Sequence, residues 1–579
     1  MKKLMLGNEA VARGLYEAGC NFVSSYPGTP STEITEEAAK YDEIYAEWAP
    51  NEKVAMESAF GASLAGKRSF CGQKHVGLNV AADPLFTISY TGVNGGMVIT
   101  VADDAGMHSS QNEQDSRHYA IAAKLPMLEP SNSQEALDFT KLAYEISEKF
   151  DTPVIIKMCT RVAHSQSIVE LGERKEKEPV TYEKDPQKFV MMPAMAKKRH
   201  PIIEERTKAL SKWAETASIN TIEEGSDNSM AIVTSSTSYQ YVKEVIGDKY
   251  PVLKLGMINP LPVEKIKTFA AKGKKLVVVE ELDGIIETHI RQIGLNPVGK
   301  DAFSPIDEFS QQSVAKTLGI KSLEGIAFPE EVPGRPPVLC AGCPHRGLFY
   351  VLKKNNITVI GDIGCYTLGA LAPLSSIDST ICMGASVSGL HGFIKSTPEN
   401  ADHTVAVIGD STFMHSGITG LVNIAYNQSN STVIILDNSI TGMTGHQENP
   451  TTGRNLKGDP AGKVCLEDLC KAIGIERVRV VDPYKLSECE AVIKEELSMA
   501  VPSVIISRRP CALLKSVKHP GPISCDTTKC VGCKSCMKIG CPAISIVNGK
   551  AVIDSTLCVG CSVCGQLCKV GALPVRKEL

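Results

Sequence analysis

The sequence lacks an excess of charge of either sign. Its 61 lysines and arginines nearly balance 65 aspartates and glutamates, so the formal net charge is −4. Nucleic acids and anionic membranes attract proteins through clustered positive charge, so neither is expected as a partner. No apolar run reaches the roughly 20 residues that a transmembrane helix needs. Glu9 breaks up any signal-type stretch at the N-terminus, which is better explained as an amphipathic first helix. These absences predict a cytoplasmic protein.

The chain is too long for one hydrophobic core. Its 579 residues predict about three to five domains. The hydrophobic fraction of 43% is ordinary for a globular protein. In a cytoplasmic protein the 20 cysteines are expected to be reduced thiols or metal ligands, because disulfides rarely persist there.

The cysteines are concentrated near the end of the chain, where nine lie between positions 525 and 568. Two sets each contain three cysteines spaced by three residues and a more distant fourth. In two-cluster ferredoxins such triplets bind one [4Fe–4S] cluster each, and each fourth cysteine serves the other cluster. One cluster is therefore expected on Cys530, Cys533, Cys536 and Cys568. The second is expected on Cys558, Cys561, Cys564 and Cys541. Zinc is the alternative, although its sites usually use C-x2-C pairs. Cys525 is expected to be a bystander.

Upstream of these sets, a strand–helix–strand pattern carries polar residues at both strand ends. "TVAVIGD" and "STVIILDN" are short apolar runs typical of buried strands, and "SGITGLVNIAYNQ" has helical spacing. Such a unit makes its strands parallel, so Asp410 and Asn438 should lie at the same sheet edge. Their oxygens suit Mg²⁺, and nearby glycines allow a diphosphate to approach the backbone. An ordinary strand–helix–strand unit with turn residues is the alternative.

This pattern resembles the diphosphate-binding motif of thiamine-dependent enzymes. Gly409 and Asp410 are followed by Asn438 28 residues after the aspartate, and Ser411 stands where glycine is usual. The resemblance implies thiamine diphosphate as cofactor, with Asp410 and Asn438 binding Mg²⁺. It also implies that the cofactor is contacted by Gly409, Asp410, Ser411, Asn438, Ile440 and Gly442.

A second segment resembles the other half of a thiamine site. In "NEKVAMESAFGASLAG" a glutamate, Glu52, opens a helix rich in small residues. In thiamine enzymes such a glutamate comes from another domain and holds N1′ of the aminopyrimidine. The resemblance implies that Glu52 is catalytic and binds the cofactor. A helix-terminal acid stabilised by the helix dipole is the alternative.

"SSYPGTPSTEI" is expected to turn from a strand into a helix, with Thr29 as the cap and Pro30 at the first helical position. Helix N-termini bind anions. The segment resembles a loop of the 2-oxoacid:ferredoxin oxidoreductases, in which a threonine and a later arginine hold the substrate carboxylate. This resemblance implies that role for Thr29 and for Arg117, which follows the apolar run "GGMVITVAD". A solvated loop residue is the alternative for Arg117.

The resemblance extends over nearly the whole chain. "KHVGLNVAADP", "CAGCPHRG", "GDIGCYTLG" and "MGASVSGLHG" resemble one branch of that family, the large (alpha) subunit of indolepyruvate ferredoxin oxidoreductase. Cys340 and Cys343 are expected to form a turn near the cofactor, and a further metal site is the alternative.

The expected fold is α/β and multidomain, with two thiamine-diphosphate-binding domains built on doubly wound parallel sheets. The expected domains, in chain order, are a pyrimidine-binding domain at residues 1–175, a charged helical linker or insertion at 176–228, a transketolase-C-terminal-like domain at 229–330, a diphosphate-binding domain at 335–510 and a 2[4Fe–4S] ferredoxin-like domain at 520–579.

The resemblance implies thiamine-dependent oxidative decarboxylation of aryl 2-oxoacids, such as indolepyruvate, to aryl-acyl-CoA and CO₂. Electrons would pass through both clusters to ferredoxin. Related enzymes carry a further domain that contacts coenzyme A or completes the site, and no segment here matches it. A smaller beta subunit is therefore expected, in a heterodimer or heterotetramer. A non-oxidative decarboxylase or carboligase is one alternative. A non-catalytic electron-transfer subunit is another, suggested only by Ser411.

Overall fold

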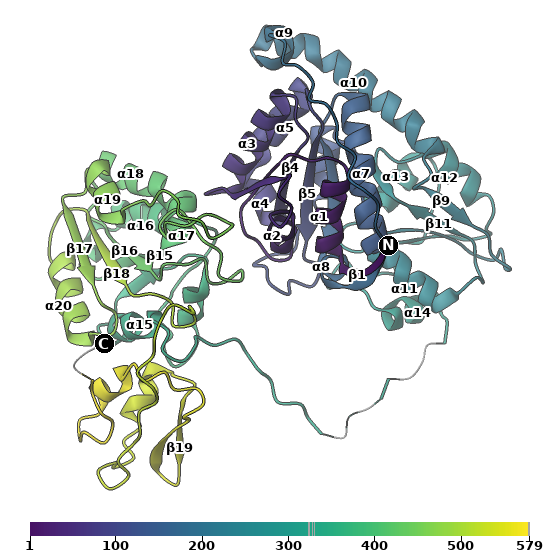
Figure 1. Cartoon of the computed structure of the whole chain (residues 1–579). Helices are drawn as coiled ribbons and strands as arrows, with labels where there is room; N and C mark the ends of the chain where they lie inside the picture. Colours follow the sequence, from purple (N-terminus) through teal and green to yellow (C-terminus); the bar gives the residue numbers. More distant parts are fainter. Residues whose placement is uncertain (322–324, 327, 329, 577–579) are drawn as a thin grey trace. The chain divides into compact units, whose positions relative to one another are not determined.

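The computed structural model describes residues 1–321, 325–326, 328 and 330–576. The chain divides into two compact units, an N-terminal unit of residues Met1–Pro329 and a C-terminal unit of residues Glu330–Leu579 (Figure 1). Among the described residues, no helix has both the length and the apolar character to cross a membrane.

The N-terminal unit is built on a seven-stranded sheet with the order β12-β6-β7-β5-β4-β2-β3. All neighbours are parallel except β12 and β6. The strands are β2 (Phe22–Ser25), β3 (Tyr45–Trp48), β4 (Ser69–Lys74), β5 (Met97–Asp103), β6 (Met127–Leu128), β7 (Val154–Cys159) and β12 (Met257–Asn259). Every residue of β4, β5 and β7 is buried, because helices cover both faces.

The helices on the two faces come from different parts of the first 170 residues (Figure 1). One face is covered by α3 (Glu52–Leu64), α4 (His75–Val80) and α5 (Ala82–Thr91), and the other by α1 (Gly7–Glu17) and α7 (Ser133–Phe150). Shorter helices are α2 (Thr32–Ala38), α6 (Arg117–Ala123) and α8 (Thr160–His164). An antiparallel ribbon joins β1 (Lys2–Leu6) to β8 (Gln166–Glu170).

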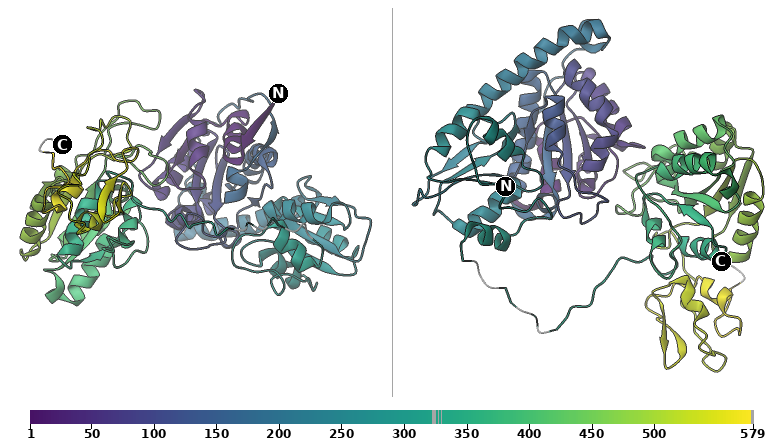
Figure 2. Two further views of the ribbon diagram at one scale, coloured as in Figure 1. Left: turned by 90° about the horizontal axis from the view of Figure 1, so that it is seen from below. Right: turned by 180° about the vertical axis from the view of Figure 1, so that it is seen from behind.

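A second, four-stranded sheet completes the N-terminal unit, in the order β13-β10-β11-β9. Its strands are β9 (Thr221–Glu223), β10 (Ala231–Ser235), β11 (Val252–Leu255) and β13 (Leu276–Val279), of which only β9 is antiparallel to its neighbour. Its helices are α11 (Ser236–Ile246), α12 (Val263–Ala270), α13 (Ile285–Gln292) and α14 (Gln311–Leu318). The segment expected as a helical linker contains α9 (Pro186–Phe189) and the long helix α10 (Pro193–Thr216), which runs from α9 to α12 (labelled in Figure 1). In Figure 2 the same long helix is seen from two other directions.

The C-terminal unit contains a fully parallel five-stranded sheet with the order β14-β15-β16-β18-β17. The strands are β14 (Thr358–Ile360), β15 (Thr404–Gly409), β16 (Thr432–Asp437), β17 (Arg477–Val481) and β18 (Ser503–Arg508). The main helices are α15 (His345–Lys354), α16 (Ala385–Ser396), α18 (Ile418–Tyr426), α19 (Leu466–Ile473) and α20 (Leu486–Leu497). The two strands and the helix predicted around Asp410 are confirmed as β15, β16 and α18, and the strands are parallel as predicted.

Residues 520–576, called the tail below, contain an antiparallel hairpin, β19 (Ile544–Val547) and β20 (Lys550–Ile553), and two short helical turns at Ser535–Ile539 and Val563–Leu567. This tail is drawn in yellow beside the green sheet segment in Figure 1. One hydrophobic core joins the two parts, because buried Leu339 and Leu348 belong to the same cluster as Ile539 and Leu567 of the tail.

The predicted beginning of the fold was partly wrong. The first helix does not start at the N-terminus, because residues 2–6 form β1, which pairs with β8, and α1 begins only at Gly7. The periodicity that suggests an amphipathic helix is present in α1, but the pairing with a strand 160 residues later is not visible locally.

Candidate active site

The two predicted Mg²⁺ ligands lie side by side in the C-terminal unit. Asp410 follows directly after β15 and Asn438 directly after β16, at the shared carboxyl edge of two paired strands. Both are buried, with exposed fractions of 2% and 8%. When the amide nitrogen of Asn438 faces its acceptors, it donates to Asp410 Oδ1 at 3.2 Å and to the carbonyl of Ile440 at 2.7 Å. The expectation that parallel strands bring the two side chains together is met.

The environment of the Asp410 carboxyl favours a bound cation. Burial, together with the nearby charge of Asp437, raises its pKa to about 7, although hydrogen bonds from Ser411 N–H and from the side chains of Asn449 and Thr451 act in the opposite direction. A carboxylate that is costly to ionise in this setting gains from a divalent cation, which replaces the proton. The oxygen-rich surroundings therefore fit Mg²⁺ chemically.

Two residues that the sequence did not single out complete this group. Asn449 Nδ2 donates to Asp410 Oδ2 at 3.4 Å, and Thr451 Oγ1 donates to the same oxygen at 3.2 Å. They lie in "NPTTG", a cluster of turn residues that indicates a loop and gives no sign of where the loop folds back.

The residues around Ser411 and the glycines shape the rest of the site. Ser411 Oγ accepts a hydrogen bond of 2.8 Å from Thr441, so the serine is accommodated where glycine is usual. A Cβ at Gly409 would lie 2.8 Å from the ring of Tyr366, too close for any larger residue. A Cβ at Gly442 would lie 3.4 Å from Cys365 Sγ and 3.9 Å from Asn438 Nδ2, which are ordinary contact distances, so the protein itself leaves room at this position.

Glu52 lies in the N-terminal unit, at the first position of α3, with an exposed fraction of 5%. Asn51 caps this helix by accepting from Val54 N–H. Glu52 is packed against α4, because a Cβ at Gly77 would fall 2.6 Å from its Oε1. The structure thus holds the Glu52 carboxyl close to the backbone of α4, and Gly77 makes that approach possible.

Thr29 lies in the turn between β2 and α2, half-buried, and its carbonyl accepts a hydrogen bond of 3.4 Å from Ser109 Oγ. The predicted helix start was two residues too early: Ser31 is the cap and Thr32 the first helical residue. Gly28 N–H donates to Thr32 Oγ1, which keeps residues 28–31 outside the helix. The strand-to-helix turn itself is confirmed. The substrate role of Thr29 stays a prediction.

Arg117 is one of the most deeply buried side chains of the N-terminal unit, with an exposed fraction of 2%, and not a solvated loop residue. It forms ion pairs with Asp115 at 2.6 Å and Glu280 at 2.5 Å, and donates to the carbonyls of Glu281 and Asp283. A substrate carboxylate would have to displace one of these oxygens. Binding of substrate by Arg117 stays a prediction, and the observed contacts give it no support.

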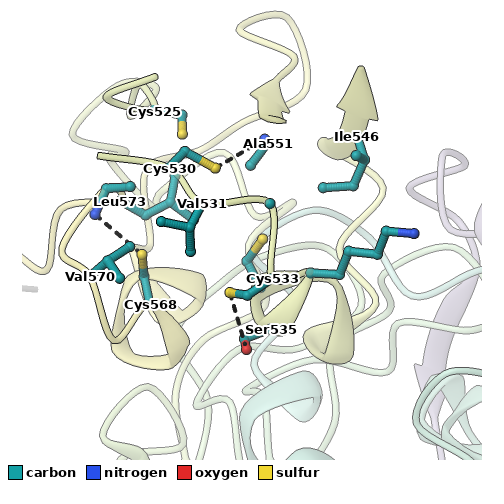
Figure 3. Close-up of a pocket in the computed structure, with 14 residues that line it drawn as sticks. Cys525, Cys530, Val531, Cys533, Ser535, Ile546, Ala551, Cys568, Val570 and Leu573 are labelled. Carbon is teal, nitrogen blue, oxygen red and sulfur yellow. Dashed lines mark hydrogen bonds between the residues drawn. The ribbon is translucent and has the colours of Figure 1, made fainter. Parts of the chain in front are cut away.

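Two cavities, one within the tail and one where the tail meets the sheet segment, divide the predicted cluster ligands into the two expected sets. The first is drawn in Figure 3. Its lining includes Cys525, Cys530, Cys533, Cys536 and Cys568. The lining of the second includes Cys541, Cys558, Cys561 and Cys564. The fourth cysteine of each sequence motif thus lines the cavity that holds the triplet of the other motif. We name these the outer and the inner cavity, respectively.

Backbone N–H groups donate to sulfur atoms of two cysteines that line the outer cavity. Ala551 N–H donates to Cys530 Sγ at 3.5 Å, and Ala572 N–H donates to Cys568 Sγ at 3.2 Å. The N–H groups of Ala551 and Gly532 lower the pKa of the Cys530 thiol. Hydrogen bonds of this kind stabilise thiolates and tune iron–sulfur clusters. Cys525, expected to be a bystander, also lines the outer cavity and so lies close to the predicted ligands.

Cys340 and Cys343 form the predicted turn, closed by a hydrogen bond of 3.2 Å from Cys343 N–H to the carbonyl of Cys340. The thiol of Cys340 also lies near those of Cys365 and Cys511, close enough for its charge to influence both. A further metal site, the alternative for this motif, gains no support, because the described residues contain no group of three His, Cys, Asp or Glu side chains that could hold one metal ion.

In the part of the chain that the structure describes, no three His, Cys, Asp or Glu side chains converge closely enough to hold one metal ion. A [4Fe–4S] cluster places its four thiolates around a cube of iron and sulfide, so its ligands are spread more widely than those of a single ion. The two cavities offer the four cysteine thiols that each such cluster needs.

Two families of known thiamine-dependent proteins match separate parts of the chain. Residues 13–229 match the family "Pyruvate flavodoxin/ferredoxin oxidoreductase, thiamine diP-bdg". Residues 362–507 match "Thiamine pyrophosphate enzyme, C-terminal TPP binding domain", which includes Asp410 and Asn438. The chain therefore has thiamine-diphosphate-binding domains in both units.

Similar proteins cover the chain from end to end. "Indolepyruvate oxidoreductase subunit IorA" of Archaeoglobus fulgidus is 42% identical over 100% of this chain and 98% of its own length. The proteins of the same name from Pyrococcus horikoshii and Methanothermobacter marburgensis are each 39% identical, over 100% and 98% of this chain and 97% and 96% of their own lengths. These relatives confirm the resemblance drawn from the motifs. The chain belongs to the IorA family of indolepyruvate oxidoreductases, thiamine-dependent enzymes of the 2-oxoacid:ferredoxin oxidoreductase type.

Proposed function

We propose that this enzyme oxidatively decarboxylates aryl 2-oxoacids, such as indolepyruvate, and passes the electrons through two [4Fe–4S] clusters to ferredoxin. Coenzyme A receives the acyl group. The names of the relatives support indolepyruvate as the type of substrate. Because those names also describe a subunit, we propose a smaller partner subunit that completes the enzyme.

The observation that carries the proposal is the buried contact between Asp410 and Asn438. Thiamine diphosphate, when bound, supplies a carbon nucleophile and an electron-accepting ring, which let a 2-oxoacid lose CO₂. Asp410 and Asn438 would supply oxygen ligands to Mg²⁺ on its diphosphate, and the backbone at Gly409 and Gly442 would lie against the phosphates. Asn449 and Thr451 hold the Asp410 carboxyl in place.

Glu52 would act on the opposite end of the cofactor. Its carboxyl would hold a proton at N1′ of the aminopyrimidine and so favour the tautomer that serves as a base. The burial of Glu52 and its packing against Gly77 support this role. A side chain held in one position keeps its hydrogen-bonding geometry toward a bound cofactor.

The two cavities support a pair of clusters as the electron route. Each holds cysteines in the crossed arrangement that two-cluster ferredoxins use. A non-oxidative decarboxylase or carboligase would leave these cavities without a function. A non-catalytic subunit does not agree with the oxidoreductase names of full-length relatives.

The test is anaerobic dye reduction by the full chain with its partner subunit. Indolepyruvate, phenylpyruvate and pyruvate are compared, each with and without coenzyme A, while CO₂ and aldehyde are measured in parallel. Reduction of a viologen dye that favours the aryl substrates is expected. A strong preference for pyruvate would overturn the aryl assignment alone. Release of CO₂ and aldehyde with no electrons reaching any acceptor would overturn the oxidative mechanism.

A further inference from the structure

Arg346 is a buried cation at the junction between the sheet segment of the C-terminal unit and its tail. It lies in the first turn of α15 and has an exposed fraction of 5%. Its guanidinium donates to carbonyl oxygens on both sides of the junction. These belong to Leu339 and to Cys340 (2.9 Å) before α15, and to Ile539 (3.3 Å) and Gly540 in the tail.

Within the described part of the chain, no carboxylate neutralises this charge. Among the residues that the structure describes, Arg346 has no ion pair with Asp or Glu, and the partners of its N–H groups are neutral carbonyls. A buried charge without a counter-charge costs several kcal/mol. The ionisable groups that act on Arg346 are instead thiols, those of Cys343, Cys541, Cys340 and Cys561. Two of these, Cys541 and Cys561, line the inner cavity.

The inner cavity itself spans the same junction. Besides its four cysteines, its lining includes Ala341 and Gly342, which precede α15. The lining of the outer cavity comes only from residues 525–573 of the tail. A cluster in the inner cavity would therefore lie against the diphosphate-binding segment, and one in the outer cavity would lie beyond it.

We propose that Arg346 is the counter-ion of the iron–sulfur cluster in the inner cavity, and that its guanidinium fastens the turn before Cys541 to α15. The inference rests on the proposed function, because it needs the clusters. Four thiolates give such a cluster a net negative charge, and taking up one electron adds another. A fixed cation beside it favours the reduced form, so Arg346 raises the reduction potential of the inner cluster and makes it the electron acceptor next to the cofactor.

The test compares substitutions on the same helix in anaerobically purified full chain. Arg346→Gln removes the charge, and Lys354→Gln removes a charge at the far end of α15, where Lys354 pairs with Glu490 in solvent. Redox titration followed by electron paramagnetic resonance is expected to give two midpoint potentials in the wild type. Arg346→Gln should shift one of them to a more negative value, and Lys354→Gln should shift neither. Two unchanged potentials in Arg346→Gln would overturn the proposal.

Arg346→Lys separates charge from geometry. Lysine keeps the positive charge but lacks the planar fork that reaches several carbonyls at once. Its midpoint potentials should match the wild type, while limited proteolysis between residues 511 and 525 becomes faster. If Arg346→Gln fails to assemble clusters, Arg346→Lys must still assemble them, and a lysine variant as impaired as the glutamine variant would contradict the counter-ion role. Wild-type protein without iron and sulfide would instead overturn the proposed electron route.

Discussion

At the scale of single residues, the buried carboxyl of Asp410 would make the proposed Mg²⁺ binding depend on pH. Its pKa is raised to about 7, so between pH 4 and 7 the folded metal-free chain holds a proton that the unfolded chain has lost. Asp410 therefore contributes most stability at low pH, and this contribution is lost as pH rises toward 7. In the proposal Mg²⁺ binds the ionised form and therefore displaces that proton.

We expect Mg²⁺ and thiamine diphosphate to bind about tenfold more weakly at pH 6 than at pH 8, because one pH unit below the pKa leaves about a tenth of the carboxyl ionised. Calorimetric titration at both pH values, in buffers of different ionisation heat, measures the affinity and the released proton. Asp410→Asn cannot ionise and reports any titration that belongs to the cofactor itself. Equal pH dependence in the variant and the wild type would assign the effect elsewhere.

Glu52→Gln keeps the shape of the side chain but loses the acidic proton. We expect turnover to fall by roughly 10²–10⁴-fold, the usual range for a lost acid–base contribution, with a much smaller change in thiamine diphosphate affinity. Glu57→Gln is the matched control, since Glu57 is exposed on the same helix and pairs with Lys53. Near-normal turnover in Glu52→Gln would remove Glu52 from the reacting end of the cofactor.

Which residues the sequence could predict depended on where their neighbours lie along the chain. Asp410 and Asn438 were predictable because parallel strands align their own ends. Asn449 and Thr451 were not, because a loop without periodicity brings them back to Asp410. For Arg117, the partner Glu280 is 163 residues away, so nothing local indicates burial.

At the scale of elements, Arg117 ties the seven-stranded sheet to the second sheet of the N-terminal unit. It begins α6, and its partner Glu280 follows β13. Burial alone would raise the pKa of Asp115, but the charge and the hydrogen bonds of the adjacent Arg117 lower it to about 2. Glu280 is fixed from the other side by the N–H groups of Ile286 and Glu287 at the start of α13.

Arg117→Met should therefore lower the free energy of unfolding of the N-terminal unit by about 3–5 kcal/mol, because it leaves two buried carboxylates without their cation. Both tryptophans, Trp48 and Trp213, lie in this unit, so fluorescence during urea unfolding reports on it selectively. Arg161→Met, which removes an exposed pair with Glu308, should cost less than about 1 kcal/mol. Unchanged stability with a raised KM would favour the substrate role for Arg117 instead.

Strands and helices with strong patterns were predicted well, and their ends were not. The helix at Glu52 and the strands β5, β15 and β16 form where apolar periodicity indicates them. The start of α2 depends on hydrogen bonds of Gly28 with Ser31 and Thr32, which no periodicity encodes. Likewise, β12 joins the first sheet although its sequence lies among elements of the second, because its antiparallel partner is β6.

At the scale of the whole molecule, three parts of the chain serve one reaction in the proposal. Glu52 belongs to the N-terminal unit, while Asp410, Asn438 and the cysteine sets belong to the C-terminal unit. The family matches cover the first two parts separately, and a relative that is 42% identical matches 100% of this chain. The tail shares a hydrophobic core with the diphosphate-binding segment, so the proposed electron route would be fixed to the unit that holds Asp410.

Breaking the electron route should spare the chemistry that precedes it. Cys561 lines the inner cavity, so Cys561→Ala, with the partner subunit present, should still bind the oxoacid and release CO₂ but should stop reducing ferredoxin or a viologen dye. Cys465→Ala, an exposed thiol outside both sets, should keep full dye reduction. Persistent dye reduction in Cys561→Ala would show that electrons leave by another path. Loss of CO₂ release with intact thiamine diphosphate binding would mean that decarboxylation requires the inner cluster to accept an electron. The tail would then control the rate of decarboxylation as well as carry the electrons away.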